Sequence, residues 1–276
     1  MTADIGKQTS LDGTMSFWGH LAELRGHLVR SAIAIVTGGI VAFLAKDFIF
    51  NTIILAPKET YFLTNRAFCF ISRELGLPAL CINTEPLKLI NIDMAGQFTT
   101  HIYTSLIAGL IISIPYVVWE IWRFIKPGLE PNERAHSKGA VAVTSFLFLS
   151  GVLFAYFLIV PLSINFLGSY QVSYLVENQV ALRSYISLVT TITLATGLVF
   201  ELPIFVYFLS KAGLLTPEFM RKNRKLAFVL IIALSAIITP PDVFSQVMVS
   251  VPLIILYEIS IGICKRVNLK LEAESL

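Results

Sequence analysis

One carboxylate, Glu201, lies inside the otherwise uncharged apolar run Ser184–Ser210. A bare carboxylate at the depth of the membrane hydrocarbon costs several kcal/mol, so such residues usually face a bundle interior, a cavity or a partner. Pro203 follows two residues later and is expected to bend the helix beside the carboxylate, because proline lacks a backbone donor. The pattern leaves two interpretations open. Glu201 is either a functional polar or proton-carrying group, or a structural glutamate that is protonated or hydrogen-bonded to a neighbouring helix.

Two further carboxylates stand in polar segments, Glu23 in HLAELR and Glu133 in KPGLEPNER. A carboxylate accepts a planar guanidinium fork through two parallel hydrogen bonds, which favours arginine over lysine. Two such groups near a membrane surface would hold two adjacent arginines of a ligand. The alternative is ordinary ion pairing, of Glu23 with Arg25, His27 or His20 and of Glu133 with Arg134 or Lys138. Such surface pairs are common and weak, and spacing alone favours this alternative.

No catalytic constellation is present in the sequence. It contains no glycine-rich phosphate loop followed by lysine, no H-E-x-x-H and no G-x-S-x-G. Three cysteines fit neither a metal site nor a disulfide-rich scaffold. We therefore expect no enzymatic activity, no metal and no cofactor. The main rival function is a proton-coupled transporter that uses Glu201 and His101, but a relay would need more such groups, and carriers usually show repeats that this chain lacks. A membrane scaffold without a ligand is the third possibility.

Membrane-spanning helices must hold these residues in place. Of the 276 residues, 55% are hydrophobic and only 14% are charged, with a mean hydropathy of +0.75, whereas soluble domains carry roughly 25% charged residues. The net charge of +3 does not suggest nucleic-acid binding. We predict one all-α polytopic domain that begins with an amphipathic helix at about 16–30 and has no cleavable signal peptide. Six spans are predicted at 31–45, 94–119, 139–160, 184–210, 226–239 and about 243–264. The fifth is short, at about 21 Å.

The basic residues predict how the chain is oriented. With six spans, the N-terminus, the loops 119–138 and 211–225, and the C-terminal tail share one side and hold most of the 21 Lys and Arg residues. Both termini are therefore expected in the cytoplasm. The long connection 46–93 then faces outward and contains Cys69 and Cys81, which an oxidising compartment would let pair. Two unpaired thiols are the alternative, and Cys264 is expected to stay reduced.

Several short motifs follow one another along almost the whole chain. They are HLAELR at 20–25, Ala56-Pro57, PYVVWEIWRFIKPGLEPNER at 115–134, FAYF at 154–157 with Pro161, FELP at 200–203, RKNRK at 221–225 and TPPDVFSQ at 239–246. In this order they resemble the TatC family, the multispanning receptor component of the twin-arginine protein translocase. The resemblance implies six helices in a concave, glove-like bundle, with the last two helices short and both termini cytoplasmic.

The resemblance also implies a function. A protein of this family binds the twin-arginine signal peptides of folded cargo proteins and self-associates in a larger complex. It assembles a translocation site with small single-span partners of the TatA and TatB type, driven by the proton-motive force. Because the N-terminus does not resemble a transit peptide, we expect a bacterial cytoplasmic membrane.

Matched residue by residue, the resemblance assigns roles to several side chains. Glu23 and Glu133 match the signal-recognition carboxylates, with Arg25 beside the first. Glu201 matches the membrane-embedded glutamate that contacts partner helices and the inserted signal peptide. The positions that match structural motifs are Pro57, Phe98, Pro240, Pro241 and Asp242. The chain departs from the commoner family pattern around 60–84, where the outward loop is extended and holds two cysteines.

Overall fold

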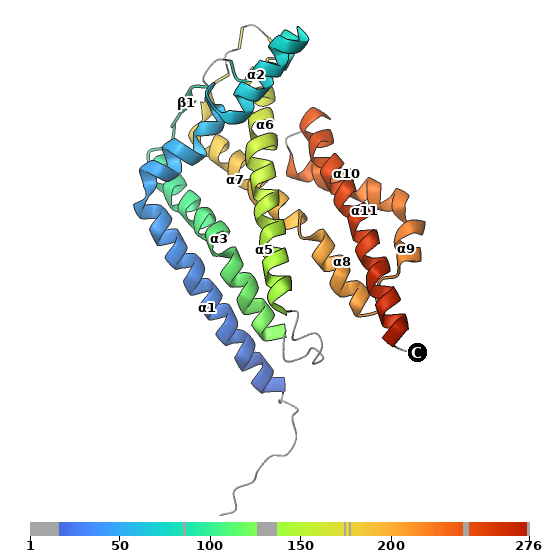
Figure 1. Cartoon of the computed structure of the whole chain (residues 1–276). Helices are drawn as coiled ribbons and strands as arrows, with labels where there is room; N and C mark the ends of the chain where they lie inside the picture. The colour runs from blue at the N-terminus through green and yellow to red at the C-terminus, as the bar shows by residue number, and fades with distance from the viewer. Residues whose placement is uncertain are drawn as a thin grey trace, which may run out of the picture.

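The computed structural model describes residues 17–84, 87–125, 137–173, 175–176, 178–239 and 243–274. This part of the chain is almost entirely helical, which confirms the predicted all-α class (Figure 1). Within it, five helices are long and apolar enough to cross a membrane: Leu21–Leu44, Gly96–Ile125, Gly139–Ser169, Leu182–Lys211 and Ser245–Lys270. Each of these corresponds to one of the six predicted spans, and the fifth predicted span, 226–239, is the one without a counterpart.

The first two long helices, α1 (Phe17–Leu44) and α3 (Gly96–Ile125), lie side by side along their length (Figure 1). The segment predicted as an amphipathic helix and the first predicted span form one helix, because neither glycine nor proline interrupts residues 27–37. The backbones of α1 and α3 approach closely where Gly109 faces Gly39. A Cβ on Gly109 would lie 2.3 Å from the Gly39 nitrogen.

A cap follows α1 and covers one end of the bundle (Figure 1). It contains the π-helical turn η1 (Phe48–Ile54), the 3-10 turn η2 (Ala56–Lys58), helix α2 (Leu63–Leu75) and the 3-10 turn η3 (Pro78–Leu80). Strand β1 (Leu89–Ile90) then pairs in parallel with β2 (Val180–Ala181), with Leu89 opposite Val180. The predicted long connection is therefore a folded structure and not an open loop.

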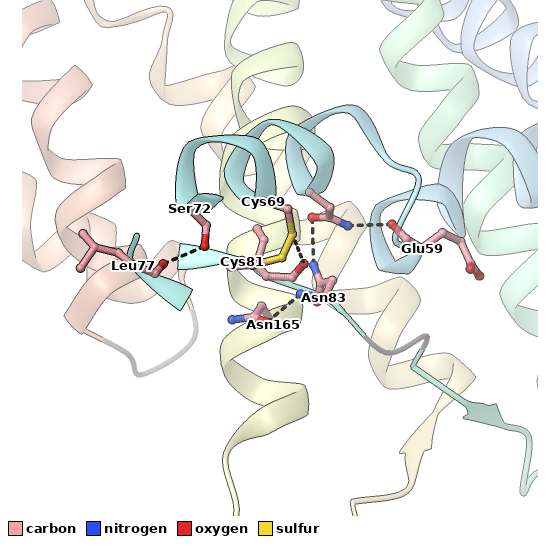
Figure 2. The surroundings of a disulfide bond; sticks show 9 residues. Glu59, Cys69, Ser72, Leu77, Cys81, Asn83 and Asn165 are labelled. Carbon is pink, nitrogen blue, oxygen red and sulfur yellow. Dashed lines mark hydrogen bonds between the residues drawn. A yellow bond between two sulfur atoms is a disulfide. The ribbon is translucent and has the colours of Figure 1, made fainter. Parts of the chain in front are cut away.

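A disulfide and a set of asparagines fix the cap to the bundle (Figure 2). The structure joins Cys69 to Cys81, the pair for which the sequence left both states open. Two residues later, the Asn83 side-chain amide donates to Asn65 Oδ1 at 3.1 Å and to the Pro161 carbonyl at 3.0 Å. The Asn83 backbone N–H donates to Asn165 Oδ1 at 2.9 Å. The disulfide thus links α2 covalently to the segment around Asn83, which is hydrogen-bonded to the bundle.

The third long helix consists of α5 (Ser137–Phe154), the π-helical turn η5 (Ala155–Ile159) and α6 (Val160–Ser169). The predicted span 139–160 stops just before Pro161, but the helix continues for two more turns to Ser169. A proline cannot donate to the carbonyl four residues earlier, which here belongs to Phe157. That carbonyl accepts a hydrogen bond from the Thr64 hydroxyl of the cap instead. The cap thus satisfies the acceptor that the proline leaves unpaired.

The fourth long helix is broken, as predicted, beside Pro203. α7 (Leu182–Val199) ends and α8 (Leu202–Lys211) begins on either side of Phe200 and Glu201. The proline ring would clash with the carbonyl four residues earlier, that of Val199, and α7 ends at that residue. The prediction of a bend beside the carboxylate is confirmed.

The last elements are α9 (Pro217–Lys222), α10 (Arg224–Ile238) and α11 (Val243–Glu274). α10 is short, with 15 residues, but α11 has 32, so the prediction that the last two helices are short is wrong for α11. Its predicted end near Cys264 was the end of the apolar run, whereas helix-forming polar residues continue it to Glu274. α11 packs along α8 and α10, opposite the α1–α3 pair (Figure 1).

Candidate functional site

A polar cluster lies between α1 and α3 near the N-terminal end of α1. On each helix, three side chains follow at intervals of four and three residues, which places them on one face. They are Glu23, His27 and Arg30 on α1, and Tyr116, Glu120 and Arg123 on α3. We call these six residues the α1–α3 polar cluster. Both helices continue from their apolar segments into these polar residues without a break. The polar side chains therefore keep the helical spacing and lie on one face of each helix.

Glu120 is the centre of this cluster and is fully buried. Its Oε2 atom lies 2.5 Å from His27 Nδ1 and accepts a hydrogen bond from Arg30 Nε at 3.1 Å. Its Oε1 atom accepts from the Tyr116 hydroxyl at 2.9 Å and lies 3.7 Å from an Nη atom of Arg123. The contact between His27 and Glu120 is a hydrogen bond, and Arg30 Nη2 lies 2.9 Å from the same Nδ1 atom. A buried charge is costly unless it is paired and hydrogen-bonded, and Glu120 meets both conditions.

Glu23 lies one turn before His27 on the same helix and has a different environment. It is half-buried, and its Oε2 atom is buried without a hydrogen-bonding partner among the described residues. Arg25, two residues later, is exposed. The predicted second carboxylate, Glu133, lies outside the described residues, so its proximity to Glu23 stays a prediction. Glu23 therefore has an acceptor oxygen that no described residue uses.

Glu201 lies in the break between α7 and α8 and is also buried. Neither of its oxygens has a hydrogen bond of ordinary geometry within the described chain, although the backbone of Phe148 on α5 is near. Other buried hydroxyls in this half of the bundle also lack such partners in the described residues: Thr144 and Ser145 on α5, Thr193 and Thr196 on α7, and Ser210 on α8. This interior contains polar groups that a polar side chain from outside would satisfy.

The remaining predicted residues fall into four groups. Pro57 is buried and its carbonyl accepts from Asn65 at 3.1 Å, so its surroundings are structural. Phe98 is 62% exposed near the start of α3. Pro240, Pro241 and Asp242 lie outside the described residues. His101 is the residue considered for a proton relay. Its Nε2 atom is hydrogen-bonded to the Phe43 carbonyl at 3.1 Å, and its ring stacks on the Phe43 ring. No group of three or more potential metal ligands occurs within the described residues.

The chain is similar to known proteins in both sequence and fold. Residues 19–252 match the family described as Sec-independent protein translocase protein (TatC). The chain belongs to the TatC family. The TatC of Blattabacterium sp. subsp. Periplaneta americana is 38% identical over 258 residues, which cover 93% of this chain and 97% of that protein. The TatC of Carboxydothermus hydrogenoformans is 34% identical over 260 residues, covering 94% and 96%. A crystal structure of the twin arginine translocase receptor TatC is 33% identical, with a TM-score of 0.68, and covers 90% of this chain and 99% of that one.

TatC membership confirms the resemblance seen in the motifs and sets the class of function. The chain is a component of protein transport and a multi-pass membrane protein. The family is a translocase component without enzymatic activity. This class of function agrees with a candidate site made of charged and hydrogen-bonding side chains between helices.

Sequence reasoning missed Glu120, which it placed at the start of a charged loop. In the structure α3 continues to Ile125, and Glu120 is one of its most buried side chains. The spacing of Tyr116, Glu120 and Arg123 carries the helical period past the apolar run, and this signal was present in the sequence. The pairing with α1 was not visible, because His27 lies 93 residues earlier.

Proposed function

We propose that this chain is the receptor subunit of a twin-arginine translocase in a bacterial cytoplasmic membrane. It binds the twin-arginine signal peptides of folded proteins, self-associates, and assembles a translocation site with small single-span partners of the TatA and TatB type. Transport is driven by the proton-motive force. The family match over 19–252 and the similarity to a protein titled twin arginine translocase receptor support this proposal.

The observation that carries the recognition chemistry is the Oε2 atom of Glu23, which is buried and has no hydrogen-bonding partner among the described residues. A guanidinium presents several N–H donors in a planar fork, and a carboxylate oxygen without a partner is the complementary group. Glu133 is the second carboxylate of the proposed site, and Arg25 flanks the first. A lysine ammonium is a point charge without the fork geometry, so the site should prefer paired arginines over paired lysines.

We further propose six spans with both termini in the cytoplasm and a concave, glove-like bundle. α10 is the fifth of these six spans despite its length, and it crosses either because the bilayer is thinned or because protein shields its ends. The distribution of Lys and Arg supports this orientation. The disulfide gives independent support, because Cys69 and Cys81 lie in the cap, at the opposite end of α1 from Glu23 (Figure 1). Disulfides persist in oxidising compartments and are rare in the cytosol.

Glu201 is the proposed contact for a partner or cargo helix within the membrane. Its two oxygens are buried without ordinary hydrogen bonds among the described residues, and leaving a carboxylate in that state is costly. A polar side chain on a helix inserted against α5 and α8 would supply the missing partner. This role is docking and involves no chemical step.

Crosslinking tests the proposed recognition. Two synthetic signal peptides that differ only in paired arginines or paired lysines are added to the full-length protein in lipid nanodiscs. Photo-reactive groups are placed beside Glu23 and Glu133. We expect the paired-arginine peptide to crosslink much more strongly and Glu23→Gln to remove that preference. Glu218→Gln, an exposed site on α9, is the matched control and should keep it. Equal crosslinking of both peptides to the unmodified protein would refute the proposal.

A further inference from the structure

Three sets of contacts tie α1 to α3 in one register. Residue numbers on α1 fall as those on α3 rise: Phe43 with His101, Ala34 with Ser113, and His27 with Glu120. This is the order expected of two antiparallel helices. The Glu120 contact lies nearest to the turn of α1 that carries Glu23. The position of that turn relative to α3 therefore depends most directly on Glu120.

Three of the acceptor positions of Glu120 are taken by hydrogen bonds within the protein. A carboxylate offers about four lone-pair positions. His27 and Arg30 occupy those of Oε2, and Tyr116 and Arg123 face Oε1. The side chain is fully buried, so an incoming guanidinium would first have to displace one of these groups. Glu120 and Glu23 are thus chemically alike but differ in what surrounds them.

Glu23 depends on this contact for its orientation. It precedes His27 by four residues, which is about 6 Å along the helix axis. Gly26 lies between them, and glycine weakens a helix interior because it adds backbone freedom. The end of a helix tends to open unless it is held by packing or hydrogen bonds. His27 and Arg30 supply such a hold through Glu120.

We propose that Glu120 is a positioning residue for signal-peptide recognition. Its carboxylate joins α1 to α3 through His27 and Arg30, and this fixes the orientation of the Glu23 carboxylate, whose Oε2 atom has no partner among the described residues. The ligand contacts Glu23, and Glu120 acts through α1 without touching the ligand. This inference rests on the proposed function, since it names the group that keeps the recognition carboxylate in place.

The test combines hydrogen exchange with peptide binding on the full-length protein in nanodiscs. Glu120→Ala removes the joint, whereas Glu120→Gln keeps the shape and one acceptor oxygen for His27. We expect Glu120→Ala to speed amide exchange around Glu23 and to weaken binding of the paired-arginine peptide by roughly 2- to 30-fold. Glu120→Gln should stay closer to the unmodified protein in both measurements. Glu258→Ala is the control, because it removes an exposed pair with Arg224 and should change neither.

Each outcome decides between positioning and direct contact. If Glu120→Ala and Glu120→Gln weaken binding equally, the charge of Glu120 acts on the ligand and the proposal is wrong. Unchanged exchange around Glu23 in Glu120→Ala also overturns it. If Glu120→Ala does not fold, Arg30→Ala removes one partly exposed partner and gives the same exchange measurement. If the unmodified protein does not prefer paired arginines, the proposed function is wrong. Amide hydrogen exchange measured without peptide still tests whether Glu120 holds α1 against α3 through His27 and Arg30.

Discussion

Alanine at Gly109 would test the register of α1 and α3, on which the polar cluster depends. The added Cβ would lie 2.3 Å from the Gly39 nitrogen, 2.6 Å from the Gly39 Cα and 2.7 Å from the Ile35 carbonyl oxygen. All three are backbone atoms of α1, so no side-chain rotation relieves the overlap. The two helices must move apart.

The size of the effect follows from three contributions. Overpacking a close contact typically costs about 1–3 kcal/mol. Separating the helices also weakens the hydrogen bond from Ser113 to the Ala34 carbonyl, 2.9 Å long, which contributes about 0.5–1.5 kcal/mol. The higher helix propensity of alanine offsets about 1 kcal/mol. We therefore expect Gly109→Ala to lower the free energy of unfolding by about 1–3 kcal/mol, or roughly 2–4 °C in Tm for each kcal/mol.

Gly39 provides the matched control, because it faces Gly109 across the same contact. A Cβ on Gly39 would meet the Ser105 carbonyl oxygen at 3.5 Å and the Leu106 Cα at 3.7 Å, which are ordinary van der Waals distances. We expect Gly39→Ala to melt at or above the unmodified protein. The assay is thermal unfolding of the purified full-length protein in one detergent, followed by circular dichroism. Equal losses for the two variants would refute the close approach and the register built on it.

Three further predictions concern the cap and the membrane carboxylate. Replacing both Cys69 and Cys81 by serine should lower the free energy of unfolding by about 2–3 kcal/mol. Reductant should then lower the Tm of the unmodified protein but not that of the double variant, and equal shifts in thermal melts would count against the staple. Asn83→Ala should cost about 1–3 kcal/mol in the same melts, because it leaves the Asn65 and Pro161 oxygens without this donor, whereas alanine at the exposed Asn178 should cost less. Glu201→Leu should raise the free energy of unfolding by about 1–3 kcal/mol, because it removes a buried acceptor, and should reduce recovery of small single-span partners in pull-downs; a less stable variant would contradict this interpretation.

Local rules account for what the sequence predicted correctly. A span must be apolar whatever its neighbours are, so hydropathy located the long helices without tertiary information. The break at Glu201 was predictable for a similar reason, since Pro203 interrupts the backbone hydrogen bonds of its own helix. The sequence also singled out Glu23 as a recognition carboxylate, from its chemistry and its motif, and this role stays a prediction.

Helix ends were predicted less well, because the limit of an apolar run is not the limit of a helix. α3 continues past Trp119, the third helix past Val160, and α11 past Cys264. Pro161 does remove one backbone donor from its helix, as the local rule says, but this loss does not end the helix in the tertiary structure. The cap residue Thr64 takes the carbonyl that the proline leaves free, and the helix continues.

The sequence by itself determined the family, the spans and the carboxylates that stand out by their surroundings in the chain. It did not show how the surroundings of Glu23 and Glu120 differ, because residue type and helical spacing are the same for both. Only the tertiary structure decided that Glu120 has hydrogen-bonding partners from two helices, while the buried Oε2 atom of Glu23 has none among the described residues. The physical reason is that the energy of a buried carboxylate depends on the donors around it, and these come from residues distant in sequence.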